Sequence, residues 1–460
     1  MSKRFWLVVA IVSIVGLLAV GAIAAQGVTG TQAPGTWVSS INIQNTGTSD
    51  ATVLLTFYDS SGAEALAYTV DPPIAANGSR SLYVPAEIPG LADGQYSVIA
   101  SSDQPLQIVA NSSSSTPATA GAYTGLQSDE VGKALYFPGL YNNYYGFYSE
   151  MVLQNIESQD ATVTLAFYDQ ATGAPVKEIT GVNIPATSSR VFALADLAGV
   201  PSGNATGLLS AKVTSDRDLA AVANIWSSAM YGEYGDYNAY VVGATAVVYA
   251  PALYNNYYGF VSALTIQNID SINADIKVTY SNGVTETKTL LPNQAFQYYQ
   301  PNNAALPSGN SAGVFSAKVE SLNSAQIVVL VNVEDKNKGL LASYNGPSSA
   351  STSVNVPVVL KSFYNWFSAQ TVQNVGSAST DITITYADGH SKAFTGVPAN
   401  GTVNIIELDS AGSVLPDGSS ISAVITSSGE PIVAVVQENS EVMYGATPGD
   451  YLLAYTGIAQ

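Results

Sequence analysis

The chain has 460 residues and a formal net charge of −19, from 34 acidic and 15 basic residues. Proteins that bind nucleic acid present a basic surface, whereas this chain is strongly acidic. Nucleic acid is therefore excluded as a predicted partner. The absence of cysteine excludes a disulfide framework, a thiolate metal site and a lipid-modified cysteine. Only 11% of the residues are charged and 47% are hydrophobic. This composition favours a folded, secreted protein that packs against its own copies, wall polymer or glycan.

The first predicted element is a leader over residues 1–25. Lys3 and Arg4 precede an apolar run that ends at Val20, and small residues up to Ala24 provide a signal-peptidase site. We therefore expect cleavage near this position and a secreted protein at the extracellular cell surface. The alternative is an uncleaved N-terminal anchor, since the run is almost long enough to span a bilayer. No transmembrane domain is predicted in the mature form if the leader is cleaved.

A Gln-Asn phrase then recurs at intervals of about 110 residues, which indicates an internal repeat. It ends the segments SINIQN, EMVLQN, ALTIQN and AQTVQN. A second run with a period of two follows each phrase, in DATVLLTFYD, DATVTLAFYD, ADIKVTYSNG and TDITITYADG. Alternation of this kind, rich in β-branched and aromatic residues, predicts half-buried strands.

Each copy ends with two strand-like segments joined by a polar turn, as in GQYSVIASSDQPLQIVAN and SSISAVITSSGEPIVAVVQEN. The second segment is almost wholly apolar, as expected of a strand buried on both faces. Frequent turn signals without a helical period predict an all-β chain of four tandem antiparallel Ig-like β-sandwich modules. We expect a rod-like array. The predicted modules cover residues 26–130, 131–246, 247–353 and 354–460.

These features resemble the tandem immunoglobulin-like modules of secreted bacterial cell-surface proteins. The resemblance rests on module length, strand pattern and phrases such as SINIQN, LTFYD and EPIVAVVQEN, and it covers nearly the whole chain after the leader. The chain departs from antibody domains, because it lacks their Cys…Trp…Cys core. The resemblance implies a place on the cell surface or in the extracellular matrix, and it implies no particular activity.

A tyrosine-rich phrase is present twice, as PGLYNNYYGFYS and PALYNNYYGFVS, each in front of a Gln-Asn strand. Its Asn-Asn pair is predicted to form a two-residue turn, because Asn accepts positive φ. The aromatics are expected either to pack at module junctions and stiffen the rod, or to form a platform for sugars or a second subunit. The candidate interface or glycan-contact residues are Trp37, Tyr141, Tyr144, Tyr145, Phe147, Tyr254, Tyr257, Tyr258, Phe260, Phe363, Tyr364 and Trp366.

No catalytic residue is predicted, and the chain is not expected to be an enzyme. His390 is the only histidine and follows a predicted Asp-Gly turn, so we expect an exposed turn residue and not a member of a catalytic triad. No pair of acids is singled out by its spacing for general acid–base chemistry.

No metal site is predicted, although calcium remains open as a cofactor. Asp216, Asp218, Glu334 and Asp335 are weak calcium candidates, because they lie in predicted loops. None of these loops matches a full set of calcium ligands, so solvated turn acids are the alternative.

The predicted function is a non-enzymatic extracellular structural protein of the cell surface, self-assembling into a filament, sheath or surface layer. Low charge, β-rich modules and junction aromatics favour this prediction, since β-modules associate end to end or by strand addition at exposed edges. The alternative is an adhesin or glycan-binding protein that uses the Tyr/Asn-rich loops at module junctions.

Overall fold

The computed structural model describes residues 6–12, 33, 35–115, 117–128, 130–227, 232–241, 245–335, 337–408, 412–440 and 449–460. The regular secondary structure of these residues is nearly all β-strand, arranged in several antiparallel sheets, so the predicted all-β class is confirmed. The helical elements among them are α1 (Val84–Glu87) and the 3-10 turns η1 (Leu194–Asp196) and η2 (Gln300–Asn302). None of the described helices has the length and apolar character that crossing a membrane requires.

The strands form sets that follow one another along the chain. The first set contains β1 (Trp6–Val12), β2 (Trp37–Asn45), β3 (Val53–Tyr58), β4 (Glu64–Thr69), β5 (Ser79–Tyr83), β6 (Tyr96–Ser102), β7 (Leu106–Ser115), β8 (Ala118–Thr124) and β9 (Leu126–Gln127). The second set contains β10 (Gly132–Tyr144), β11 (Phe147–Asn155), β12 (Ala161–Asp169), β13 (Pro175–Ile184), β14 (Ser189–Ala193), β15 (Leu208–Ser227), β16 (Tyr234–Asn238) and β17 (Tyr240–Val241).

The remaining strands form two further sets. The third set contains β18 (Val247–Tyr257), β19 (Phe260–Asn268), β20 (Ala274–Tyr280), β21 (Thr285–Leu290), β22 (Ala295–Tyr299), β23 (Val314–Ser321), β24 (Ile327–Asp335) and β25 (Leu340–Asn345). The fourth set contains β26 (Ser353–Lys361), β27 (Trp366–Asn374), β28 (Thr380–Tyr386), β29 (Ser391–Val397), β30 (Thr402–Ile406), β31 (Ser419–Ser427), β32 (Ile432–Ser440), β33 (Leu452–Thr456) and β34 (Ile458–Ala459).

The strand order is the same in every set. The order β4-β3-β6-β1 corresponds to β13-β12-β15-β10, β21-β20-β23-β18 and β29-β28-β31-β26. A second series of pairings, β5-β2-β7-β8 in the first set, corresponds to β30-β27-β32-β33 in the fourth. In the second and third sets, β10 pairs with β11 and β18 with β19, so that both series join into one eight-stranded sheet.

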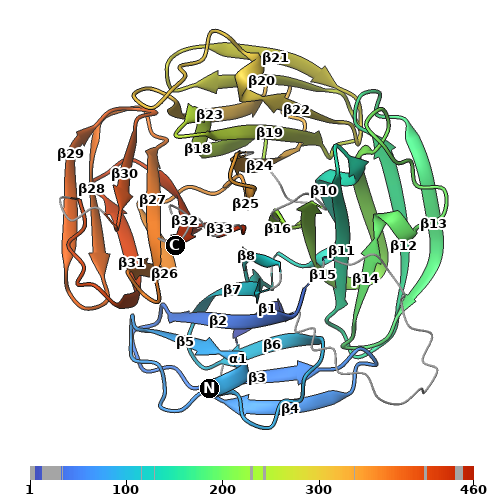
Figure 1. Cartoon of the computed structure of the whole chain (residues 1–460), viewed down its shortest axis with the longest axis horizontal. Helices are drawn as coiled ribbons and strands as arrows, with labels where there is room; N and C mark the ends of the chain where they lie inside the picture. The colour runs from blue at the N-terminus through green and yellow to red at the C-terminus, as the bar shows by residue number, and fades with distance from the viewer. Residues whose placement is uncertain are drawn as a thin grey trace.

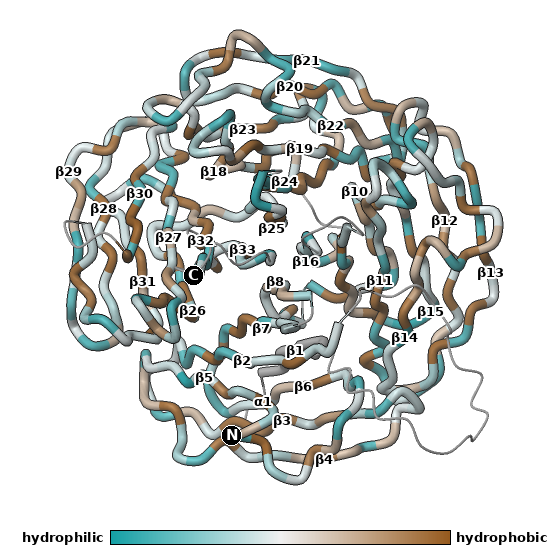
Figure 2. Tube along the Cα trace, in the orientation of Figure 1, coloured by the Kyte–Doolittle hydropathy of each residue, from teal (hydrophilic) through white to brown (hydrophobic). Residues whose placement is uncertain are grey.

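Apolar side chains fill the space between the two series of strands within a set. In the first set, Ile43 of β2 and Ile108 of β7 lie in one cluster with Leu55 and Phe57 of β3 and Val98 of β6. Full burial of an aliphatic or aromatic side chain contributes roughly 1.5–3 kcal/mol. Figure 2 shows the alternation of apolar and polar residues along the strands that gives each sheet a buried face.

The asparagine of the Gln-Asn phrase stabilises the turn that follows it. Asn45 Nδ2 donates to the carbonyls of Ser49 at 2.8 Å and Ile74 at 2.9 Å, and Asn45 Oδ1 accepts the N–H of Gly47 at 2.8 Å. A buried amide with this many partners fixes the local backbone. The asparagines that bind the carbonyl four residues on in the same way are Asn155, Asn268 and Asn374, at 2.7–2.8 Å.

The sets close into a ring, so the prediction of a rod-like array is wrong (Figure 1). The central strand β8 contacts β16, β16 contacts β25, β25 contacts β33, and β33 returns to β8. A serine at the same strand position makes a polar contact across each junction between sets. At three junctions the serine hydroxyl donates to a backbone carbonyl: Ser97 Oγ to Thr187 (3.0 Å), Ser210 Oγ to Asn293 (3.0 Å) and Ser316 Oγ to Asn400 (3.3 Å). At the fourth junction the backbone N–H of Ser422 donates to Ser79 Oγ (3.1 Å).

The four central strands β8, β16, β25 and β33 start at one end of the ring axis, where Asp450 joins them. This buried carboxyl group, whose pKa is raised by burial, accepts the N–H of Tyr234 at 2.6 Å and that of Leu341 at 2.9 Å on Oδ2. Its Oδ1 accepts the N–H of Leu452 at 3.1 Å, and the Asp450 N–H donates to the carbonyl of Ala118 at 2.8 Å. One side chain and its own amide therefore contact all four strands.

The same four strands end together at the opposite end of the axis. The Asn238 N–H donates to Asn345 Oδ1 at 2.9 Å, and Asn345 Nδ2 donates to the Asn238 carbonyl at 2.7 Å. Asn238 Nδ2 also donates to the Thr124 carbonyl at 2.9 Å, and Thr456 Oγ1 donates to the Asn345 carbonyl at 2.6 Å. The central strands thus run in the same direction and are joined by polar contacts at both ends.

Strand β1 occupies, in the first set, the place that β10, β18 and β26 occupy in the others. It pairs with β6 on one side and with β9 on the other, as β26 pairs with β31 and β34. The segment Trp6–Val12 lies within the predicted leader, and an apolar run rich in Val and Ile suits both a leader and a strand. Removal of residues 1–25 therefore stays a prediction.

Asp450→Asn is expected to lower the free energy of unfolding by about 1–3 kcal/mol. The amide of asparagine has one acceptor oxygen, whereas N–H groups now donate to both oxygens of Asp450. Its NH2 group would therefore meet another donor, either the Leu452 N–H or the pair of N–H groups from Tyr234 and Leu341, and those hydrogen bonds would be lost. Urea denaturation measures the change, and Asp388→Asn on an exposed turn is the control, with a change within about 0.5 kcal/mol. Wild-type stability in Asp450→Asn would contradict the structural role of this carboxylate.

Candidate functional site

The candidate site starts at the hairpins that precede the Gln-Asn strands. Between β10 and β11 the turn residues are Tyr145 and Gly146, with φ of 51° and 85°. Between β18 and β19 they are Tyr258 and Gly259, with φ of 49° and 96°. Positive φ at both turn residues is the geometry that suits the twist of a two-residue hairpin.

The predicted Asn-Asn turn is therefore wrong. Asn142 and Asn255 lie inside β10 and β18 and are 3% exposed. Asn143 and Asn256 do have φ of 55°, but they lie where the strand pairing shifts register, before the turn itself. The sequence signal for positive φ was correct, and it marked a bulge in the strand instead of the hairpin turn.

The turn tyrosines hold a strained backbone that neighbouring asparagines stabilise. Asn204 Oδ1 accepts the N–H of Tyr145 at 2.7 Å, and Asn310 Oδ1 accepts the N–H of Tyr258 at 2.7 Å. A left-handed conformation costs a residue with a Cβ roughly 1–2 kcal/mol. Such strain is retained where the surrounding structure fixes it, and it is frequent at functional sites.

The fourth set has the same turn with different residues. Phe363 and Trp366 bridge, and Tyr364 and Asn365 lie between them with φ of 49° and 67°. The first turn residue is therefore an exposed tyrosine in three sets. We call these residues the tyrosine tips: Tyr145, Tyr258 and Tyr364, which are 68%, 59% and 83% exposed.

The tyrosine tips lie on the face of the ring where Asp450 lies. In the second set Tyr148, three residues after the tip, pairs with Trp226, and Trp226 pairs with Tyr234, whose N–H binds Asp450. The third and fourth sets have the same register. The pairs there are Val261 with Glu334 and Glu334 with Leu341, then Phe367 with Asn439 and Asn439 with Leu452.

Other aromatics of the phrase lie at junctions between sets. Tyr141 Oη accepts Asn332 Nδ2 of the third set at 2.8 Å, and burial raises the pKa of its phenol. Tyr254 Oη donates to Gln437 Oε1 of the fourth set at 2.6 Å. Trp37, at the start of β2, is 6% exposed and lies 4.5 Å from the ring of Tyr234 in the second set. Buried junction contacts and exposed positions are thus divided among different residues of the phrase.

The remaining candidates pack within their own hairpins or beside the central strands. Phe147 lies 6.0 Å from Tyr141, and Phe260 lies 5.9 Å from Tyr254. The other ring contacts are Tyr144 with Tyr145 (4.8 Å), Tyr257 with Tyr258 (4.9 Å), Phe363 with Tyr364 (4.8 Å) and Trp366 with Tyr451 (6.3 Å).

A cavity of about 510 Å³ lies between the second and third sets. One wall is the hairpin of the second set, so the structure brings four predicted residues together there. On the opposite wall the sequence singled out Glu334 alone, as a weak calcium candidate, and it missed the other residues, because the segment AFQYYQP shows only a strand pattern. The first wall is Tyr141, Tyr144, Tyr145 and Phe147, and the principal residues of the second are Phe296, Gln297, Tyr299, Asn332 and Glu334.

Buried carboxyl groups lie at two other junctions. Glu150 Oε1 accepts Asn224 Nδ2 at 2.8 Å, and burial raises its pKa to about 7. Burial also raises the pKa of Asp236 to about 8, with Glu150 nearby adding to the effect. Glu438 of the fourth set has a pKa of about 8 for the same reason, and its Oε2 accepts Asn111 Nδ2 of the first set at 2.9 Å.

The acids predicted as weak calcium candidates are not gathered into one site. Asp216 and Asp218 lie in β15, and Glu334 and Asp335 lie in β24, so the prediction that they are loop acids is wrong. Asp216 Oδ1 accepts the N–H of Thr162 at 2.7 Å, Glu334 lines the cavity, and Asp335 lies 3.6 Å from Lys338 Nζ. Within the described parts of the chain, no group of three or more His, Cys, Asp or Glu side chains is placed to hold a metal ion.

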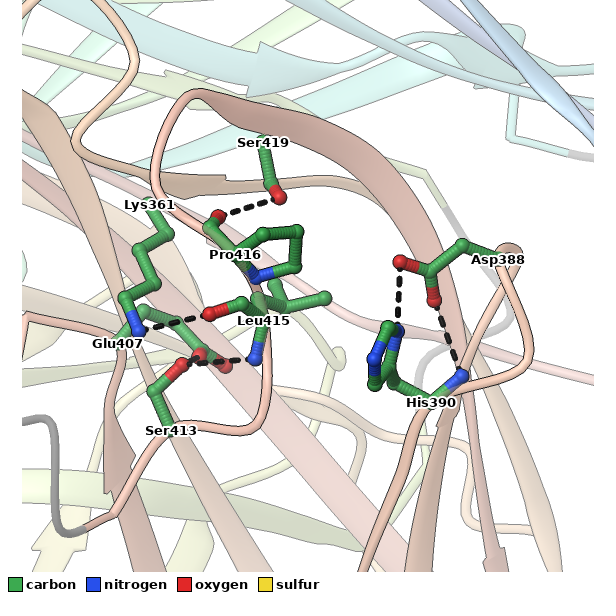
Figure 3. A network of polar contacts seen from close by, with 8 residues as sticks. All are labelled: Lys361, Asp388, His390, Glu407, Ser413, Leu415, Pro416 and Ser419. Atoms are coloured by element: carbon green, nitrogen blue, oxygen red, sulfur yellow. Dashed lines mark hydrogen bonds and ion pairs between the residues drawn. The ribbon is translucent and has the colours of Figure 1, made fainter.

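His390 lies on the turn where the sequence places it. Its Nδ1 is 2.9 Å from Asp388 Oδ2, and its side chain is 51% exposed (Figure 3). The two serines drawn there donate elsewhere: Ser413 to Glu407, and Ser419 to the Pro416 carbonyl at 2.7 Å. The polar contacts of this region are therefore those of a turn and a buried carboxylate.

Comparison with known proteins gives no family. No family model and no curated protein matches the chain. The crystal structure of Thermotoga maritima 1070 aligns with 24% of this chain and 93% of its own, at 18% identity and a TM-score of 0.20. The pilus backbone RrgB of Streptococcus pneumoniae aligns with 53% of this chain and 82% of its own, at 8% identity and a TM-score of 0.14.

Stability is expected to fall as the pH rises from about 4 to about 9, because Glu150, Asp236 and Glu438 have folded pKa values above their unfolded ones. Their contribution is complete below the unfolded pKa and is lost as the pH passes the folded pKa. The glutamine of Glu438→Gln does not titrate, so the variant does not lose this contribution. Its free energy of unfolding relative to that of wild type should therefore be higher at pH 9 than at pH 4, by on the order of 3 kcal/mol. Parallel pH curves of unfolding free energy for wild type and variant would contradict this assignment.

Tyr258→Asn is expected to leave the stability unchanged or raise it by up to about 1 kcal/mol, because Asn tolerates left-handed backbone. Tyr254→Phe is the contrast, since it removes the buried hydroxyl that binds Gln437 and should cost about 1–2 kcal/mol. Thermal denaturation compares the two. Equal losses would show that the exposed tyrosine is a packing residue.

Proposed function

We propose that the four strand sets are four Ig-like β-sandwich modules that work as one ring. The predicted bounds 26–130, 131–246, 247–353 and 354–460 describe them, except that the first set also contains β1 (Trp6–Val12), which lies before residue 26. The common strand order supports this division. The same asparagine contacts within each set and the same serine position at each junction support it as well. The unit that associates with further copies is therefore proposed to be a ring of four modules instead of the predicted rod.

We further propose a non-enzymatic extracellular structural protein of the cell surface that self-associates through the tyrosine tips. The observation that carries this proposal is the repetition of an exposed, strained tyrosine on one face of the ring. Tyrosine is enriched at protein interfaces, because its large ring is buried with few rotors lost. The three equivalent tyrosine side chains on one face of the molecule offer a contact surface that a single exposed residue does not.

The charge distribution favours contact between copies at this face. The net charge of −19 makes copies of the chain repel one another. The tip phrases YNNYYGFY and YNNYYGFV contain no charged residue, and neither does FYNWF in the fourth set. Contact at the tips therefore brings together hairpin segments that are themselves uncharged.

The position of the tips on one face limits what they assemble. Two rings that meet through the same face form a closed pair, because such a contact is isologous. Growth into a filament, sheath or layer needs a second contact. The strands β4, β13, β21 and β29 end their sheets at the rim of the ring and supply edges for strand addition (Figure 1).

Self-association is tested by analytical ultracentrifugation of the exported form from about 0.01 M to about 1 M NaCl. The dimer fraction should rise with salt, because salt screens the repulsion between acidic rings. The double variant Tyr258→Asn, Tyr364→Asn should weaken association by roughly tenfold or more. Tyr83→Asn, which changes an exposed tyrosine of β5, should leave it unchanged. A monomer at every salt and protein concentration would refute the proposal.

A second candidate function, glycan binding at the cell surface, is favoured by a different observation. The cavity beside the Tyr145 hairpin has the size and aromatic lining of a ligand site. It lies between two sets and is separate from the tips of the third and fourth sets.

A further inference from the structure

We propose that the cavity between the second and third sets binds a short neutral oligosaccharide. This inference deepens the glycan-binding candidate and does not depend on self-association through the tips. The volume of about 510 Å³ is within the range of roughly 300–1,000 Å³ that is usual for small-ligand sites. Both walls contribute aromatic rings and polar groups.

The aromatic part of the site comes from both walls. Tyr144 and Phe147 belong to the second-set hairpin, and Phe296 and Tyr299 belong to β22 of the third set. All four side chains are half-buried, so part of each ring contacts the protein and part is accessible. The negative face of an aromatic ring attracts the partly positive C–H groups of a pyranose ring.

The polar part of the site is held in place by buried hydrogen bonds. Tyr141 Oη accepts Asn332 Nδ2 at 2.8 Å and Gln297 Nε2 at 3.1 Å, and Ser343 Oγ donates to Asn332 Oδ1 at 2.8 Å. These contacts orient two amide side chains at the cavity before a ligand arrives, which reduces the entropy lost on binding. With Glu334, the lining amides offer donors and acceptors to sugar hydroxyls, which both donate and accept.

The charge of the site selects against anionic ligands. Among the described residues that line the cavity there is no Lys, Arg or His, and Glu334 contributes a carboxylate. A phosphate, sulfate or uronate group would meet this carboxylate and no cation among the described lining residues. The strongly acidic chain adds to the same repulsion. A neutral sugar is therefore the ligand class that fits the site.

The equivalent junction of the third and fourth sets lacks key groups of this site. Strand register places Ile406 of the fourth set where the third has Tyr299, since Ala263 pairs with Tyr299 and Ala369 with Ile406. Asn439 likewise stands where the third set has Glu334. The second junction therefore provides a matched control within the same molecule.

Isothermal titration calorimetry of the full chain tests the proposal. The probes are chitotriose, cellotriose and maltotriose, with trigalacturonate as the anionic comparison. At least one neutral probe should bind, and Tyr144→Ala and Glu334→Gln should each weaken that binding by roughly tenfold or more. Tyr257→Ala changes the equivalent tyrosine beside Tyr258 and should leave binding unchanged. Thermal denaturation of each variant confirms that it is folded.

The possible outcomes separate this site from its alternatives. Failure of all three neutral probes to bind at millimolar concentration would overturn the proposal. Equal losses in Tyr144→Ala and Tyr257→Ala would place binding on the hairpins in general and would also overturn it. Binding of trigalacturonate as tight as that of the neutral probes would refute the selection by charge. Loss of binding in Tyr258→Asn, Tyr364→Asn would assign the sugar to the tips.

Discussion

Closure of the four central strands is the constraint on which the rest of the molecule depends. Asp450 contacts all four at one end, and Asn238 and Asn345 connect them at the other. Each bond contributes only about 1 kcal/mol, but hydrogen bonds in one buried network strengthen one another. Because every central strand is the last strand of its series, joining them fixes the angle between neighbouring sets. Closure thereby determines which residues meet at a junction and which hairpins share a face.

The tyrosine phrase shows how one short segment serves two surfaces. Tyr141 and Tyr254 are buried at junctions with the next set, whereas Tyr145 and Tyr258 extend from the turn into solvent. The change of environment occurs within four residues, because the strand ends and the chain reverses there. The conformation that exposes the turn tyrosine also carries its backbone strain, and Asn204 stabilises this conformation in the second set.

Much of the secondary structure, and part of the candidate site, could be predicted from the sequence. Period-two runs identify strands such as Val53–Tyr58, because one sheet face is buried. The ring could not be predicted, since Ser97 and its equivalents resemble ordinary strand serines. The turn was misplaced because Asn143 signals positive φ as strongly as Gly146 does. Half of the cavity was missed because Gln297 and Tyr299 are far from the hairpin in sequence, and only ring closure brings them to it.

Because the four sets belong to one polypeptide, equivalent positions in different sets can carry different residues. Four separate identical chains in a ring would have to repeat every junction, so a change that opened one cavity would open four. In a single polypeptide, the carboxylate of Glu334 and the amide of Asn439 can occupy equivalent places without affecting each other. The described part of the chain therefore combines the cavity at one junction with tyrosine tips in three sets, a combination that exact fourfold symmetry forbids.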